Sequence, residues 1–209
     1  MMHGFVFLDE ILEDIRWDAK YATWDNFTGK PVTGYEINRI VGTKELAAAL
    51  LQAKKIAARL GYGLLLWDGY RPQRAVDSFL EWAELPEDGD TKMKHYPKIR
   101  RSELILKGYV AAQSSHSRGS AIDLTLYELY SGKLVPMGSD FDYMDTRSHW
   151  NSSEISEEEM NNRKMLCAIM ESCGFLRYEY EWWHYVLKDE PYPDTYFDFP
   201  LVNKLKQTI

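Results

Sequence analysis

Two short motifs lie far apart in the chain, and the need to bring them together constrains the fold more than any other feature. The first is SSHSRGSAID, residues 114–123, and the second, about sixty residues later, is EWWH, residues 181–184. Together they offer two imidazoles and a carboxylate for one metal ion, and a second carboxylate to move protons. This set of side chains is typical of a hydrolase that activates water with zinc.

The first motif places His116 in a loop and Asp123 in the strand that is expected to follow it. Gly119 between them permits the tight backbone bend that would turn both side chains toward one ion. His184 would come from a separate strand. Two neutral imidazoles and a carboxylate at about 2.0–2.2 Å suit zinc and leave a fourth position for water. The His-x6-Asp spacing alone is a weak pattern, because both residues are often ordinary polar side chains.

The spacing of Glu181 and His184 in the second motif limits how both could reach one site. Glu181 and His184 lie in a segment typical of a strand, where residues three apart point to opposite faces. If both serve one site, Glu181 must lie in a turn or bulge that leads into the strand. Otherwise Glu181 is a surface acid and His184 is a core histidine beside two tryptophans.

Composition sets the class of protein. The chain has 209 residues, of which 45% are hydrophobic, enough for the core of one domain. Its formal charge is -7 and no long basic run interleaves with aromatic residues, so we expect no nucleic-acid partner. Residues 1–10 lack the pattern of a signal peptide, and no segment is apolar enough to span a membrane. We therefore expect no membrane partner and a cytoplasmic location.

Hydrophobic periodicity and capping signals predict alternating short strands and helices. Residues 17–42 and 85–98 are expected to be irregular, and the segment after Pro191, rich in proline and aromatic residues, is expected to wrap the surface. The alternation in residues 121–127 predicts a strand with one polar face. We predict strands at 5–8, 64–67, 121–127, 175–178 and 182–187, and helices at 43–60, 73–83 and 156–174. This pattern indicates one α+β domain over residues 1–209.

Longer stretches give a resemblance to a known family. WDAKYATWDNF (residues 17–27), WDGYRP (67–72), SHSRGSAIDLTL (115–126) and EWWHY (181–185) resemble the zinc D-Ala-D-Ala peptidases. That family also includes D,D-carboxypeptidases and the hedgehog fold. The likeness is to its D-alanyl-D-alanine dipeptidases of vancomycin resistance, and it covers nearly the whole chain.

The resemblance implies a role for each of five residues. His116, Asp123 and His184 would hold one Zn²⁺ per chain, Glu181 would be the general base and acid, and Arg71 would stabilise the oxyanion. It also implies a central antiparallel sheet flanked by helices, a free dipeptide substrate in the cytoplasm, and a homodimer. The residue type of Arg71 alone favours an exposed or salt-bridged arginine, and the resemblance reverses that reading.

A free dipeptide carries an ammonium and a carboxylate close to the bond that is cut. Asp142 is our candidate for the ammonium, with Tyr21 nearby, and Ser114 could donate to the carboxylate or the backbone. Aspartate and serine also favour turns, so each of these two residues could instead be a turn residue. Of the other histidines, we expect His95 to be solvated, and His149 is the rival metal ligand.

The leading hypothesis is a zinc metallopeptidase that hydrolyses D-Ala-D-Ala to two D-alanines. This would deplete the normal cell-wall precursor and support glycopeptide resistance. One alternative is a D,D-carboxypeptidase acting on longer cell-wall peptides, which would need export. Another is a non-catalytic binding module that keeps the metal site. The presence of Glu181 argues against this alternative.

Overall fold

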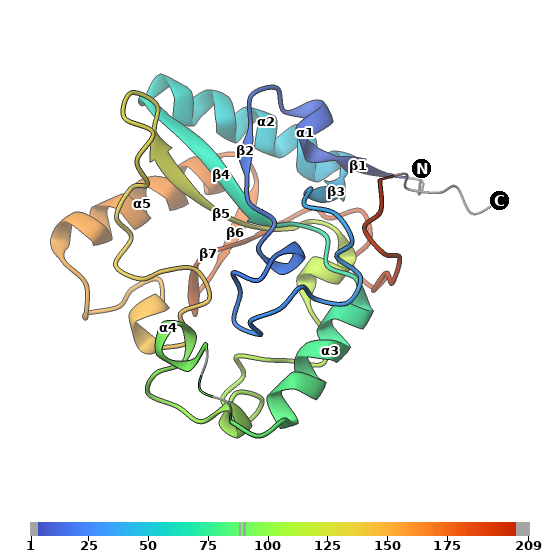
Figure 1. Cartoon of the computed structure of the whole chain (residues 1–209). Coiled ribbons are helices and arrows are strands. Elements are labelled where there is room, and N and C mark those ends of the chain that lie inside the picture. Colours follow the sequence, from blue (N-terminus) through green and yellow to red (C-terminus); the bar gives the residue numbers. More distant parts are fainter. Residues whose placement is uncertain (1–3, 88, 90, 204–209) are drawn as a thin grey trace.

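A five-stranded β-sheet forms the centre of the structure (Figure 1). The computed structural model describes residues 4–87, 89 and 91–203. The strands of this part of the chain are β1 (Phe5–Phe7), β2 (Arg16–Trp17), β3 (Val41–Thr43), β4 (Tyr62–Asp68), β5 (Ala121–Glu128), β6 (Phe175–Tyr178) and β7 (Glu181–Leu187). Its α-helices are α1 (Leu8–Ile11), α2 (Lys44–Arg59), α3 (Gln73–Glu84), α4 (Lys92–His95) and α5 (Glu157–Ser172).

The strand order in the large sheet is β2-β4-β5-β7-β6, and a small second sheet pairs β1 with β3. Pairing in the large sheet is antiparallel except between β2 and β4. The predicted α+β class with helices flanking the sheet is therefore confirmed. The sheet is mixed rather than wholly antiparallel, because the chain passes from β2 to β4 through a long crossover that contains α2, and such a crossover permits parallel pairing.

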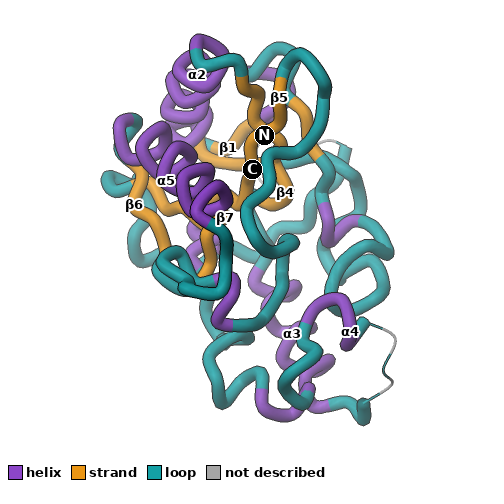
Figure 2. The backbone as a smooth tube through the Cα atoms, turned by 90° about the vertical axis from the view of Figure 1, so that its left-hand side faces the viewer, coloured by secondary structure: helices purple, strands orange, loops and turns teal. Residues whose placement is uncertain are grey.

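Helices α2 and α5 pack against each other and against strands β4 and β6. Helices α3 and α4 lie on the far side of the molecule from α2 (Figures 1 and 2). None of the helices in the described part of the chain is long and apolar enough to cross a membrane.

Capping residues set the start of each of the two long helices, as predicted. The Thr43 side chain caps α2 by accepting a hydrogen bond from the backbone N–H of Leu46 at 3.2 Å. Ser156 and Glu159 form a capping box at the start of α5. Such caps satisfy backbone donors that the first turn of a helix leaves free.

The register of the central strands decides which side chains share a face. Asp123 on β5 is opposite His184 on β7, and the next pair is Ile122 with Tyr185. Because side chains alternate along a strand, the first pair lies on one face and the second pair on the other. Charged groups of α5 act on the Tyr185 hydroxyl, so α5 covers the second face. Asp123 and His184 therefore face away from α5.

The strand predicted at residues 121–127 is present as β5, and all of these residues are buried, those of its polar face included. The chain after β5 turns back, and Leu134 pairs with Tyr127 as an isolated bridge. This bridge places the returning segment beside the end of β5.

The C-terminal segment packs against the loops that carry the first motif and Arg71. The N–H of Phe197 donates to the carbonyl of Ser117 at 2.8 Å. The Tyr70 hydroxyl both donates to and accepts from the backbone of Phe199, at 3.0 and 2.9 Å. These contacts hold the loop with Ser117 and the loop with Tyr70, which come from distant parts of the sequence, against the same C-terminal segment.

Candidate active site

Three side chains from two strands and one turn converge on a single point. His116 lies in the 3-10 turn Ser115–Arg118 before β5, and Asp123 and His184 are paired across β5 and β7. His116 Nε2 lies 3.0 Å from His184 Nδ1 and 3.2 Å from Asp123 Oδ2. His184 Nδ1 lies 2.9 Å from Asp123 Oδ1. All three side chains are buried.

This spacing suits a metal ion. Ligand atoms at about 2.0–2.1 Å from a tetrahedral zinc are about 3.3 Å from one another. Here the two imidazole nitrogens are 3.0 Å apart, and each lies 2.9 or 3.2 Å from a different oxygen of Asp123. Among the described residues, these three form a group of potential ligands whose atoms all lie within 4.8 Å of one another. The donor set of two imidazoles and one carboxylate also leaves a fourth position for water.

Hydrogen bonds outside the triangle orient both imidazoles. His116 Nδ1 donates to the carbonyl of Gly69 at 2.6 Å, so Nε2 presents its lone pair to the centre. For His184 Nδ1 to bind a cation, Nε2 must carry the proton, and the Ser115 hydroxyl lies 3.1 Å from it. Such outer partners set the tautomer and orientation of metal-binding histidines. Ser115 was not among the predicted site residues, although it is the neighbour of His116 in the first motif.

The surroundings of Asp123 favour the ionised form of its carboxyl group. Burial works to raise the pKa of Asp123, but the nearby His116 and His184 outweigh it and hold the pKa well below its ordinary value. The carboxylate is therefore ionised, as a metal ligand must be.

Glu181 reaches the same site through an irregularity in β7. Arg177 of β6 pairs with Tyr185, but the next residue, Tyr178, pairs with Glu181, so the register shifts between them. A turn or bulge at this point was expected if both residues serve one site, and the structure has a register shift there. It brings Glu181 Oε2 to 4.0 Å from His184 Nδ1. Burial raises the pKa of Glu181 to about 7, against the opposing effect of His184.

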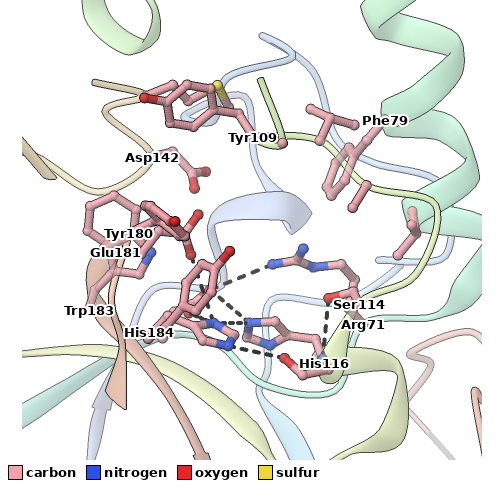
Figure 3. A pocket seen from close by; sticks show the side chains of 18 of the residues that line it. Arg71, Phe79, Tyr109, Ser114, His116, Asp142, Tyr180, Glu181, Trp183 and His184 are labelled. Carbon is pink, nitrogen blue, oxygen red and sulfur yellow. Dashed lines mark hydrogen bonds and ion pairs between the residues drawn. The ribbon is translucent and has the colours of Figure 1, made fainter. Parts of the chain in front are cut away.

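Arg71 points into the cavity from the turn after β4 (Figure 3). Its Nε donates to Asp68 Oδ2 at 2.9 Å, and Nη2 lies 3.6 Å from Asp123 Oδ2. Asp68 is itself buried and accepts a hydrogen bond from the Tyr35 hydroxyl at 2.7 Å. Arg71 is thus salt-bridged, with its guanidinium held next to the candidate metal ligands. The sequence analysis did not identify Asp68 or Tyr35.

A cavity of about 360 Å³ lies in front of these groups. Tyr21, Ser114 and Asp142 all line it. The Tyr21 hydroxyl donates to Asp142 Oδ2 at 2.8 Å, so the structure brings these two residues together. Burial, together with Asp123 and Glu181, raises the pKa of Asp142 well above its ordinary value.

Ser114 has a second role in the backbone. Its hydroxyl accepts a hydrogen bond from the N–H of His116 at 3.3 Å and so caps the 3-10 turn. Ser114 is therefore a turn residue that also borders the cavity.

Two other histidines are placed differently from the metal triangle. His149, the rival ligand, packs its ring edge-on against Tyr180 at 5.0 Å and is not part of the ligand group. His95 was expected to be solvated, and that prediction is wrong, because it is only 3% exposed. The polar segment around it folds into α4, and His95 is the residue of this helix that is buried.

Comparisons with known proteins agree in one family. The Peptidase_M15 family model, described as D-Ala-D-Ala dipeptidase, matches residues 1–202. A D-alanyl-D-alanine dipeptidase of Enterococcus faecium is 67% identical, over 95% of this chain and 98% of the relative. Proteins of the same name from Streptomyces coelicolor and Escherichia coli are 61% and 35% identical. Those matches cover 96% and 85% of this chain, and 100% and 81% of the relatives.

Proposed function

The chain belongs to the D-Ala-D-Ala dipeptidase family of M15 peptidases, and from this membership we propose that it hydrolyses D-Ala-D-Ala to two D-alanines. His116, Asp123 and His184 would hold one Zn²⁺ per chain. The observation that carries the proposal is the convergence of the three side chains. His116 Nε2 and His184 Nδ1 are 3.0 Å apart, each lies within 3.2 Å of an oxygen of Asp123, and the half-buried Glu181 and the guanidinium of Arg71 lie beside them. When bound, zinc supplies a Lewis acid and a water whose pKa falls to about 7.

Glu181 moves the protons. It takes one from the attacking water and passes it to the departing amine, as a general base and then a general acid. A pKa of about 7 suits both steps, because the group can accept and release a proton near neutral pH. Its position supports this role, since its carboxyl group lies at the cavity wall close to His184.

Arg71 stabilises the negative charge that develops on the carbonyl oxygen of the substrate. Its guanidinium is always charged and donates from a fixed fork. The bond from Nε to Asp68 leaves the other nitrogens directed toward Asp123 and the cavity. The fork is therefore held in place before the substrate arrives.

Asp142 and Ser114 bind the two ends of the substrate. In the empty cavity, burial favours the neutral form of Asp142, and an incoming ammonium would favour the ionised form. The Tyr21 hydroxyl helps to orient this carboxyl group. Ser114 donates to the substrate carboxylate or backbone at the opposite side.

This activity would deplete the normal cell-wall precursor and so support resistance to glycopeptides such as vancomycin. The same proposal includes a cytoplasmic location, where the free dipeptide is available, and a homodimer, because the family resemblance implies both.

Steady-state kinetics on two substrates test the proposal. We expect the zinc-loaded protein to have a much higher kcat/KM for D-Ala-D-Ala than for a pentapeptide that ends in D-Ala-D-Ala. A preference for the pentapeptide would replace the dipeptidase with a D,D-carboxypeptidase. Failure to hydrolyse either substrate would favour the remaining alternative, a non-catalytic binding module that contains a metal.

A further inference from the structure

His95 is buried in α4 and makes a hydrogen bond to the backbone of Asp142. Its Nδ1 lies 3.1 Å from the carbonyl oxygen of Asp142. A carbonyl oxygen only accepts, so Nδ1 carries the proton and donates it. The contact joins two segments that are 47 residues apart in the sequence.

A second hydrogen bond joins the same two segments. The backbone N–H of Met144 donates to the carbonyl of His95 at 2.7 Å. His95 therefore holds the chain on both sides of Tyr143, through its side chain at Asp142 and through its backbone at Met144. Asp142, Tyr143 and Met144 all line the cavity of the candidate active site.

Asp142 needs such support because of its backbone conformation. Its φ is 54°, in the left-handed region that residues other than glycine seldom adopt. This conformation turns the carboxyl group into the cavity, where Tyr21 donates to it (Figure 3). The carbonyl of the same residue points the other way, to His95.

The ends of the loop that carries Asp142 are held by another group. The buried guanidinium of Arg163 donates to the carbonyls of Met137, Arg147 and His149 at 2.6, 2.9 and 2.6 Å. These contacts fix both ends of the loop to α5. At its centre the contacts with His95 hold the backbone of Asp142 and Met144, beside the bonds from Tyr21 to the Asp142 carboxyl group and from Ser148 to the carbonyl of Tyr143.

We propose that His95 is a positioning residue that holds Asp142 in place to bind the ammonium group of the substrate. This inference rests on the proposed function, which assigns the ammonium to Asp142. His95 acts through the backbone of Asp142 and makes no contact with the substrate itself.

The neutral state of His95 suits this role. Burial lowers the pKa of His95 to about 4, despite its hydrogen bond to Asp142, so the imidazole is neutral at pH 7. It supplies one N–H donor without adding a positive charge behind Asp142. A cation at this position would compete with the ammonium of the substrate for the same carboxylate.

Three substitutions separate the hydrogen bond from the size of the side chain. His95→Asn keeps an amide N–H near the position of Nδ1, whereas His95→Gln moves the amide toward Nε2 and His95→Leu removes the donor. We expect His95→Leu and His95→Gln to raise the KM for D-Ala-D-Ala about tenfold, as loss of a positioning hydrogen bond would, with a smaller change in kcat. We expect the KM of His95→Asn to stay within about threefold of the wild type.

A substrate without the ammonium shows which contact is lost. D-Lactoyl-D-alanine carries a hydroxyl in place of the ammonium, so its KM should change little in His95→Leu. A matched control is Asn162→Ala, which removes a bond of 2.8 Å to the carbonyl of Pro136, at the start of the same loop. The KM of Asn162→Ala should equal that of the wild type. Thermal denaturation identifies any variant that is unfolded, and His95→Gln replaces His95→Leu if the latter does not fold.

Asp142→Asn distinguishes this inference from the proposed function. An unchanged KM for D-Ala-D-Ala in Asp142→Asn would refute the ammonium role of Asp142 itself. A raised KM in that variant, with an unchanged KM in His95→Leu and His95→Gln, would overturn the role of His95 alone. We expect His95→Leu combined with Asp142→Asn to have the KM of Asp142→Asn, because both substitutions remove the same interaction.

Discussion

Glu181 and His184 reach the same cavity from one strand, although residues three apart in a regular strand point to opposite faces. The register shift between β6 and β7 resolves this conflict and brings Glu181 Oε2 to 4.0 Å from His184 Nδ1. β-bulges commonly re-aim a side chain at a functional site. Here the bulge places a proton-transfer group beside a candidate metal ligand.

Replacing Glu181 should therefore separate metal binding from catalysis. Glu181→Gln keeps the shape of the side chain but cannot accept a proton. We expect kcat for D-Ala-D-Ala to fall by roughly 10²–10⁴ while the zinc content stays unchanged. Turnover and metal analysis of the same preparation check this, and a rate equal to the wild type would refute the role of Glu181.

Arg71 should act in the transition state more than in substrate binding. Arg71→Ala removes the donor proposed for the oxyanion, and we expect kcat to fall on the order of 10²-fold or more. Arg71→Lys should restore little, because an ammonium cannot bond Asp68 through Nε and also present a fork to the cavity. Steady-state kinetics of both variants decide the matter, and an unaltered kcat in Arg71→Ala would exclude Arg71 from the mechanism.

Ser115 should set the affinity for zinc. Without its hydroxyl, His184 Nε2 loses the partner that lies 3.1 Å away and orients the ring. We expect Ser115→Ala to bind zinc about 10- to 100-fold more weakly in competition with a chelator. Ser172→Ala is the control, because the Ser172 hydroxyl bonds at the end of α5, to the carbonyl of Ile169 and to Cys173 Sγ, and not to a candidate ligand. Equal zinc affinity in both variants would contradict the role of Ser115.

The stability of the metal-free protein should depend on pH through His95. Its pKa is lowered from 6.5 to about 4 on folding, so between these values the unfolded chain binds a proton that the folded protein does not. The contribution of neutral His95 to the free energy of unfolding is complete above pH 6.5 and is lost as the pH falls toward 4. From pH 7 to 4.5, we expect the wild type to lose about 2.5 kcal/mol more than His95→Asn. Urea unfolding at both pH values measures this difference, and equal losses in the two proteins would contradict it.

Parts of the fold with a local cause could be predicted from the sequence. The caps of α2 and α5 depend on Thr43 and Ser156, whose side chains bond backbone atoms three residues away. An irregularity before His184 could be expected as well, because residues three apart in a regular strand point to opposite faces, but the sequence did not distinguish a turn from a bulge.

The features that sequence analysis missed depend on long-range packing. His95 lies in a charged segment, and nothing in that segment indicates that its ring meets Asp142, 47 residues later. Asp68 was visible as an acid at the end of an apolar strand and three residues before Arg71, but its contact with Tyr35 spans 33 residues.

The claim that a metal held by His116, Asp123 and His184 drives hydrolysis of D-Ala-D-Ala is tested most directly by metal analysis together with a turnover assay. Purified protein should contain one zinc per chain, lose activity with the metal on treatment with a chelator, and regain both when zinc is added back. Metal-free protein that hydrolyses D-Ala-D-Ala at the undiminished rate would contradict it.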